Sequence, residues 1–271
     1  MYFVTLKNMP ANSYIEAKKR KGKALFVPFV VLGDPDRERS VEIIHQLVDN
    51  GADALELGLP FSDPPADGPV IQQADTRALT MGIRIDDCFK ILKEVRGFTD
   101  IPIGLLVYYN LVLQRGVEQF YRDCAETGVD SVLIADLPLE HAEEVVSIAK
   151  AVKVAPVFLV SEVTTEERMV QIARVADGYL YVVSYLGVTG VAHGVLEEKI
   201  RETIQRARKH TSLPLIVGFG VNTAEQVAAA ARAGADGVIV GSRIVREIPE
   251  NLKAIPALCA ELASAITPIA Q

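Results

Sequence analysis

Short apolar segments and amphipathic segments alternate along most of the chain. The apolar segments are rich in Val, Ile and Leu and mostly lack a strict alternation of apolar and polar residues. This pattern is typical of parallel β-strands whose outer face is covered by helices. We therefore predict eight strands, at Leu25–Val31, Ala54–Leu57, Ile103–Val107, Ser131–Ile134, Pro156–Val160, Gly178–Val183, Pro214–Val217 and Gly237–Val240.

The amphipathic segments between these strands have the spacing of helices. We predict helices such as those at Ser40–Asn50, Asp86–Arg96, Glu118–Thr127, Glu140–Lys150 and Glu166–Val175. A further helix is expected before the first strand, around Ala11–Lys21. Ser40 is a candidate N-cap, because its hydroxyl could accept a hydrogen bond from a free N–H of the first turn. Gly51, Gly128 and Gly234 are each expected to end a helix.

Strands that alternate with helices form a parallel sheet, and eight such units could close into a barrel or lie open in a doubly wound sheet. Two features favour the barrel. No Gly-x-Gly-x-x-Gly sequence follows the first strand, and glycine-rich turns follow the last two strands, where barrels commonly bind phosphate. Because no linker or change of composition divides the chain, we expect an α/β protein with one domain over residues 1–271. That domain is a single (β/α)8 TIM barrel with an extra N-terminal helix.

Composition and charge exclude several classes of function. With 28 Lys and Arg against 35 Asp and Glu, the formal net charge is −7, which disfavours nucleic acid and anionic membranes as partners. The longest apolar stretches have the length of strands, below the roughly 18 residues of a membrane span. Cys88, Cys124 and Cys259 lie far apart, without the spacing of a zinc site or a disulfide framework, so we expect no metal. Cysteine usage and the absence of a signal-peptide pattern indicate a cytoplasmic location.

A single acidic residue stands inside one of the predicted strands. Glu56 lies within the apolar segment Ala54–Gly58, where a buried and unpaired charge would be costly. A carboxyl group in an apolar pocket has a raised pKa and could act as a general acid and base near neutral pH. Glu56 could equally be a structural residue paired with a Lys or Arg, and this residue alone does not decide between the two interpretations.

The loop after this strand, residues 60–69, contains four prolines and two acidic residues. Proline fixes φ and stiffens a loop. A stiff loop could present Asp67 over the mouth of the barrel, so that Glu56 and Asp67 contact opposite ends of a substrate. The alternative is an ordinary turn in which the aspartates cap a helix.

Two turns after the last two predicted strands have the composition of a phosphate site. Gly218-Phe219-Gly220 follows the seventh strand, and Gly241-Ser242 follows the eighth. Glycines allow backbone N–H groups to approach an anion, and a helix N-terminus adds the positive end of its dipole. Such uncharged donors suit an acidic protein that binds an anion.

The segment Ser184–Gly190 follows the sixth strand and is either a mobile lid or a plain surface loop. Glycines flank Thr189, which favours a lid that closes on the substrate and excludes water. The four histidines form no catalytic or metal-binding pattern, and no lysine stands alone in an apolar strand end suited to Schiff-base chemistry.

Several stretches occur in an order and at a spacing that identify a family. They are Leu25–Phe29, Glu56–Pro64 with Ala66–Pro69, Gly187–Gly190, Gly218–Gly220 and Gly241–Ser242. From about Leu25 to Val245, the chain resembles the tryptophan synthase α family.

The resemblance implies a role for each site residue. Glu56 and Asp67 match the family's two catalytic carboxylates. The substrate-binding positions are Phe29, Leu106, Tyr108, Leu133, Tyr181, Thr189 and Ile239. The phosphate-binding positions are Gly190, Gly218, Phe219, Gly220, Gly241 and Ser242.

The resemblance also implies a reaction and a partner. The family cleaves indole-3-glycerol phosphate to indole and glyceraldehyde 3-phosphate by a retro-aldol step that requires no cofactor. Its members pass indole to a separate β subunit, which carries pyridoxal phosphate, within an α2β2 heterotetramer. Two alternatives stay open: a stand-alone lyase that releases free indole, and a weakly active barrel that serves as an allosteric partner of the β subunit.

Three differences from the family lie in or near its loops. Pro65 stands where Leu is usual, Val31 stands where many members have Thr, and Tyr185-Leu186 replaces a pair such as Arg-Ser. The stretch after Thr189 is also short. We expect these differences to affect the lid and the coupling to the β subunit rather than the catalytic groups.

Overall fold

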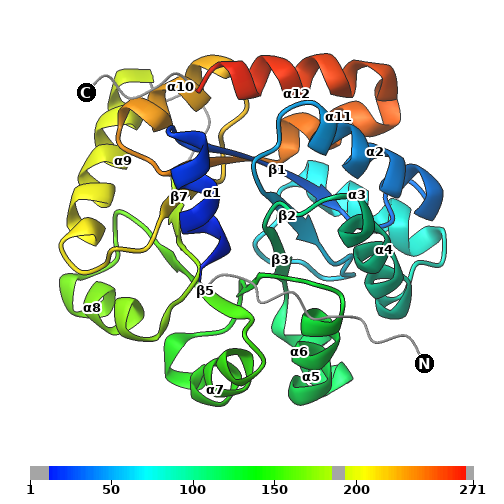
Figure 1. The fold of residues 1–271 in the computed structure, drawn as a ribbon, viewed down its shortest axis with the longest axis horizontal. Helices are drawn as coiled ribbons and strands as arrows, with labels where there is room; N and C mark the ends of the chain where they lie inside the picture. The colour runs from blue at the N-terminus through cyan, green and yellow to red at the C-terminus, as the bar shows by residue number, and fades with distance from the viewer. Residues whose placement is uncertain (1–11, 185–192, 267–271) are drawn as a thin grey trace.

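Eight parallel strands close into a barrel (Figure 1). The computed structural model describes residues 12–184 and 193–266, and within these residues the strands pair in sequence order, with β1 beside both β2 and β8. The strands are β1 Leu25–Val31, β2 Leu55–Gly58, β3 Ile103–Val107, β4 Ser131–Ile134, β5 Ala155–Val160, β6 Leu180–Val183, β7 Leu215–Gly218 and β8 Gly237–Val240. The predicted (β/α)8 barrel is confirmed, and the strand ends differ from the prediction by at most two residues.

Helices surround the barrel (Figure 1). Apolar residues of the helices face inward, as Ile43, Ile44 and Leu47 of α2 do, and the core is built mainly from Val, Ile, Leu and Ala. The helices are α1 Ser13–Lys21, α2 Arg37–Asp49, α3 Pro69–Thr80, α4 Ile85–Phe98, α5 Tyr109–Arg115, α6 Val117–Glu126, α7 Glu143–Ala151, α8 Glu166–Val175, α9 His193–Arg208, α10 Ala224–Arg232, α11 Ser242–Glu250 and α12 Ile255–Ser264, with 3-10 turns at Leu139–His141 and Leu252–Ala254.

The helix ends test the predicted caps. The prediction that Ser40 caps α2 is wrong. Asp36 is the N-cap and accepts a hydrogen bond from the N–H of Arg39 at 2.9 Å, because the helix begins one turn earlier. Ser40 is instead buried within the helix, where its hydroxyl accepts a hydrogen bond from the N–H of Gly33 at 2.9 Å. The expected helix-ending glycines are confirmed: Gly51, Gly128 and Gly234 all have positive φ angles.

The extra N-terminal helix α1 packs against the N-terminal ends of the strands. Tyr14 is 1% exposed, and its hydroxyl shares a hydrogen bond of 2.8 Å with Ser131 at the start of β4. Gly104 in β3 leaves space for this ring, because a Cβ there would lie 2.8 Å from the Tyr14 hydroxyl. The side-chain amide of Asn12, the N-cap of α1, donates to the carbonyl of Gly178 at 2.8 Å. Helix α1 is therefore part of the packed barrel.

We predict that Tyr14→Ala lowers the free energy of unfolding by about 3–5 kcal/mol, because it leaves a cavity under the barrel. Tyr14→Phe keeps the ring and should cost about 1 kcal/mol, the value of one hydrogen bond. Urea denaturation followed by circular dichroism measures both. An alanine variant as stable as the original chain would contradict the packing of α1 described here.

Candidate active site

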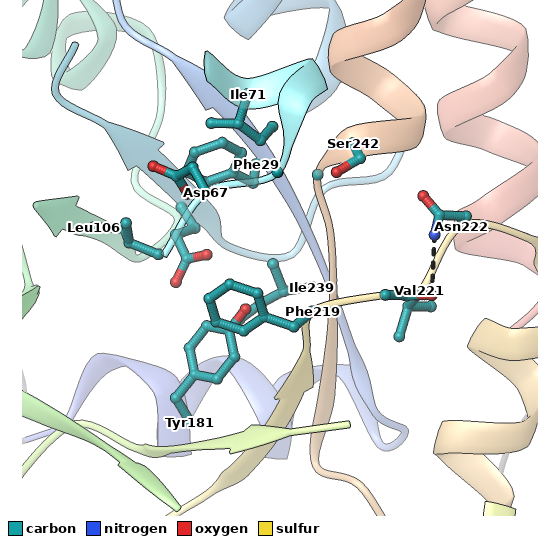
Figure 2. A pocket seen from close by; sticks show the side chains of 14 residues that line it. Phe29, Asp67, Ile71, Leu106, Tyr181, Phe219, Val221, Asn222, Ile239 and Ser242 are labelled. Carbon is teal, nitrogen blue, oxygen red and sulfur yellow. Dashed lines mark hydrogen bonds between the residues drawn. The ribbon is translucent and has the colours of Figure 1, made fainter. Parts of the chain in front are cut away.

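A pocket opens where the carboxyl ends of the strands meet, which is the usual place for the site of a barrel enzyme. Its walls are largely apolar: Phe29 comes from β1, Leu106 from β3, Tyr181 from β6 and Ile239 from β8 (Figure 2). The full lining consists of Phe29, Glu56, Asp67, Gly68, Ile71, Leu106, Tyr181, Phe219, Gly220, Val221, Asn222, Ile239, Gly241 and Ser242.

Glu56 in β2 brings a carboxyl group into this apolar surrounding. The residue is 1% exposed, and its Oε1 accepts a hydrogen bond from the Tyr179 hydroxyl at 3.0 Å. Burial raises the pKa of Glu56 to about 8, the charge of Asp67 adds to this effect, and the hydrogen bond from Tyr179 opposes it. No Lys or Arg in the described part of the chain pairs with Glu56. The interpretation as an ion-paired structural residue is therefore wrong, and Glu56 carries its proton at neutral pH.

Asp67 reaches the same pocket from the loop after β2. The Tyr108 hydroxyl donates to its Oδ2 at 2.7 Å, and the same hydroxyl accepts a hydrogen bond from the N–H of Ala66 at 3.2 Å. Burial raises the pKa of Asp67, and the bond from Tyr108 opposes this rise. Asp67 is not the cap of α3, whose N-cap is Gly68. Tyr108 therefore holds the loop in place and directs the carboxyl group of Asp67.

The turn after β7 has an unusual backbone conformation. Phe219 has a φ of +60°, which is rare for a residue with a large side chain, and Gly220 follows with +77°. The hydroxyl of Ser184 donates to the carbonyl of Phe219 and supports this conformation. A side chain at position 218 would clash with Tyr181, since a Cβ there would lie 1.9 Å from the Tyr181 hydroxyl.

The turn after β8 leads directly into a helix. Gly241 is the N-cap of α11 and Ser242 is its first residue, and both line the pocket. The first N–H groups of a helix have no partner within it, so this end of α11 offers donors and a positive dipole to an anion. Figure 2 shows Ser242 and Asn222 on one side of the pocket and Asp67 and Leu106 on the other. The pocket thus has an acidic end and an end with glycine turns and free helix N–H groups, separated by apolar side chains.

Comparison with known proteins places this geometry in a family. The family profile described as "Tryptophan synthase alpha chain" matches residues 15–269. The chain belongs to the tryptophan synthase alpha chain family. Among curated members, the tryptophan synthase alpha chain of Methanothermobacter thermautotrophicus is 51% identical over 240 residues, which cover 89% of this chain and 88% of that protein. That of Methanoregula boonei is 49% identical over 233 residues, which cover 86% of this chain and 88% of that protein.

Solved structures agree with this assignment. A chain of the Mycobacterium tuberculosis tryptophan synthase superposes with a TM-score of 0.86 at 31% identity, covering 94% of this chain and 97% of that one. The α subunit from Legionella pneumophila superposes with a TM-score of 0.85 at 35% identity, covering 94% and 98%.

The structure brings most of the predicted site residues of this family member together. Ten of them line the pocket: Phe29, Glu56, Asp67, Leu106, Tyr181, Phe219, Gly220, Ile239, Gly241 and Ser242. Tyr108 contacts Asp67, while Leu133 is buried in β4 and Gly218 packs against Tyr181, all three without lining the pocket. Thr189 and Gly190 lie outside the described residues, as does most of the predicted lid.

Sequence reasoning missed several neighbours of the site. Tyr179 bonds Glu56, and it stands two residues before Tyr181, so the alternation of a strand could have placed both on the same face. Ile71 lines the pocket one turn after Asp67. Val221 and Asn222 extend the turn after β7, and no sequence pattern marks them.

The histidines and cysteines of the described residues do not line the pocket. His45 pairs with Asp49 and His210 with Glu166 on the outside of the barrel. The three cysteines are buried and free, and the described residues contain no group of three or more His, Cys, Asp or Glu arranged to hold a metal. Within the same residues, no helix is long and apolar enough to cross a membrane.

The raised pKa of Glu56 predicts a stability difference that depends on pH. Because the folded-state pKa of about 8 exceeds the ordinary value of 4.5, the folded chain binds more protons between these values. The contribution of Glu56 to stability is therefore complete below pH 4.5 and is lost as the pH rises toward 8. Glu56→Gln stays neutral, so its stability relative to the original chain should rise by about 3 kcal/mol between pH 5.5 and 8.5, at about 1.36 kcal/mol per pKa unit. Urea denaturation at pH 5.5 and 8.5 tests this, and a difference between the two proteins that does not change with pH would contradict it.

Proposed function

We propose that this chain catalyses the α reaction of tryptophan synthase, the retro-aldol cleavage of indole-3-glycerol phosphate to indole and glyceraldehyde 3-phosphate. The observation that carries the proposal is a buried Glu56, whose pKa is raised to about 8, in the same apolar pocket as Asp67, with glycine turns at the other end. Membership of the tryptophan synthase alpha chain family supports the same reaction.

The two ends of the pocket suit the two ends of the substrate in polarity. The indole ring would pack among Phe29, Leu106 and Ile239, whose side chains are apolar. The phosphate would lie at Gly220, Gly241 and Ser242, where backbone N–H groups and a hydroxyl are available as donors. The resemblance to the family adds two further positions to this site: Thr189 in the proposed lid and Gly190 at the proposed phosphate site.

Glu56 and Asp67 would divide the chemistry between them. Glu56 donates its proton to C3 of indole, which gives the protonated indolenine, a cation with its positive charge at the ring nitrogen, and then takes a proton from the glycerol hydroxyl as the C–C bond breaks. Electrons of that bond return to the ring, so indole and an aldehyde leave and Glu56 regains its proton. Tyr108 occupies Oδ2 of Asp67. Oδ1 would accept the indole N–H and stabilise the positive charge that develops there.

The reaction proposed for this chain is one half of tryptophan synthesis. Indole would pass to a β subunit, which holds pyridoxal phosphate, in an α2β2 heterotetramer, while the α reaction itself needs no cofactor. We propose that the chain is one domain throughout and that it works in the cytoplasm, where amino-acid biosynthesis takes place. A stand-alone lyase would use the same pocket, and a purely allosteric partner would not need Glu56 and Asp67 in it.

Indole release from indole-3-glycerol phosphate, measured with and without a tryptophan synthase β subunit, tests the proposed function. Cleavage that rises strongly with the β subunit supports the reaction and the partnership together. Strong cleavage that the β subunit does not change would favour a stand-alone lyase. No cleavage under either condition would contradict the proposed reaction.

In the same assay, Glu56→Gln should lower kcat by about 10²–10⁴-fold, because an amide cannot exchange the proton that C3 requires. The variant should fold, since glutamine can still accept the hydrogen bond from Tyr179. Glu38→Gln, an exposed change on α2, is the matched control and should leave kcat unaltered. Turnover near the original rate in Glu56→Gln with the β subunit present would sink the role given to Glu56.

Gly241→Asp should raise KM about 10-fold to 100-fold, because a carboxylate would stand against the phosphate and like charges in contact cost several kcal/mol. Gly241→Ala is the control: it adds the same Cβ, 3.1 Å from the ring of Phe29, without the charge. The alanine variant should therefore raise KM much less. Equal KM values for the aspartate variant and the original chain would place the phosphate elsewhere.

A further inference from the structure

A second buried carboxyl group lies behind the loop that carries Asp67. Asp75 is on α3, one helical turn after Ile71, whose side chain lines the pocket (Figure 2). Asp75 is 4% exposed, so its carboxyl group is withdrawn from water as that of Glu56 is. Such burial is costly unless the group has a partner, which raises the question of what Asp75 contacts.

The contacts of Asp75 are directed at the loop. The backbone N–H of Phe61, in the loop after β2, interacts with its carboxyl group and lowers its pKa. Its Oδ2 has no hydrogen-bond partner among the described residues. Most buried polar atoms are hydrogen-bonded, so a buried carboxyl group with an unpartnered oxygen needs an explanation. The interaction with Phe61 points to the loop as the reason for the burial of Asp75.

The charges around Asp75 are mostly negative. Asp67 in the loop after β2 and Asp34 in the loop after β1 both raise its pKa, after the larger effect of burial, to about 7. The neighbouring cation on α3, Arg77, is committed to Asp34 through bonds of 2.7 and 2.8 Å. Tyr108 at the end of β3 also faces Asp75, which raises the pKa of that phenol. No cation in the described part of the chain compensates Asp75, so its place is not explained by an ion pair.

A continuous series of contacts links Asp75 to Asp67. Asp75 interacts with the N–H of Phe61, and the ring of Phe61 stacks on the ring of Tyr108, with centroids 5.2 Å apart and planes 26° apart. The hydroxyl of Tyr108 then donates to Asp67 and accepts from Ala66. The loop is thus fixed from α3 on one side and from β3 on the other.

We propose that Asp75 is a positioning residue for Asp67: by holding the N–H of Phe61, it fixes the Phe61–Tyr108 stack and therefore the direction of the Asp67 carboxyl group. This inference rests on the proposed function. Asp75 does not line the pocket, so it affects the rate through the geometry of Asp67 and has little effect on substrate binding.

Kinetics of three variants, measured with the β subunit present, test the proposal. Asp75→Ala removes the acceptor and should lower kcat about tenfold with less than a threefold change in KM, because positioning acts on the transition state. Asp75→Asn keeps an acceptor for Phe61 and should restore kcat to within threefold of the original chain. Gln73→Ala, on the exposed face of the same helix, is the control and should change neither constant. An alanine variant with the original kcat, or an asparagine variant as slow as the alanine variant, would overturn the proposal.

A spectroscopic measurement separates this proposal from the proposed function. The chain has nine phenylalanines, so selective ¹⁵N-Phe labelling gives few amide signals, and a Phe61→Tyr variant identifies that of Phe61. In Asp75→Ala the Phe61 amide proton should move upfield, as expected when an N–H loses its acceptor, and in Asp75→Asn it should stay near its original position. An unchanged Phe61 signal in Asp75→Ala would overturn the positioning role even if the enzyme cleaves its substrate. Failure of the original chain to cleave would refute the proposed function and leave this readout valid.

Discussion

Burial of the Glu56 carboxyl group, with no neighbouring cation in residues 12–184 and 193–266, is the constraint on which the site depends. An apolar barrel cannot stabilise a carboxylate there, so the group keeps its proton to a pH near 8. The polar contact that orients it comes from Tyr179, whose ring packs on Tyr14 of α1, with centroids 4.8 Å apart. Helix α1, which packs under the barrel, therefore supports Glu56 through Tyr179. Tyr14 and Tyr179 contribute both to the packing of the fold and to the orientation of Glu56.

The rest of the pocket is arranged around a neutral acid and an anionic substrate. A lysine or arginine close to Glu56 would favour the carboxylate and remove the proton that the proposed reaction needs. The proposed recognition of phosphate by backbone N–H groups and by Ser242 would avoid this, because helix and turn donors attract an anion without a full positive charge. The left-handed backbone of Phe219 and Gly220 is part of the same arrangement. Uncharged donors also agree with a chain of net charge −7.

Much of the fold could be predicted from the sequence, because parallel strands covered by helices are continuous apolar segments. The eight strands and the helix-ending glycines followed from this pattern. Ser40 was misplaced because the better cap, Asp36, stands one turn earlier, and propensity does not distinguish two nearby cap residues. The sequence marks the glutamate inside an apolar strand as an anomaly, yet only the tertiary structure shows that no basic residue of the described part of the chain pairs with it.

The supporting residues were harder to predict, because their roles arise from contacts between distant segments. Tyr179 lies 123 positions from Glu56, and no local pattern joins them. Asp75 stands in the sequence as an ordinary polar position of α3, and its burial and its interaction with Phe61 depend on the loop that folds over the helix. The resemblance to the family indicates which residues are assigned to substrate binding. It does not indicate the supporting residues Tyr179 and Asp75.

The protonation state of Glu56 is the central claim, and direct titration of its carboxyl group tests it. The chain with ¹³C-labelled glutamate side chains would be followed by NMR from pH 4 to 9, with Glu56→Gln used to assign the signal. A carboxyl carbon that titrates near pH 8 is the predicted result, since no charge in the described residues offsets its burial. A signal that titrates near the ordinary value of 4.5 would mean that Glu56 is charged at neutral pH, and it would contradict both the account of the pocket and the role of Glu56 as the acid.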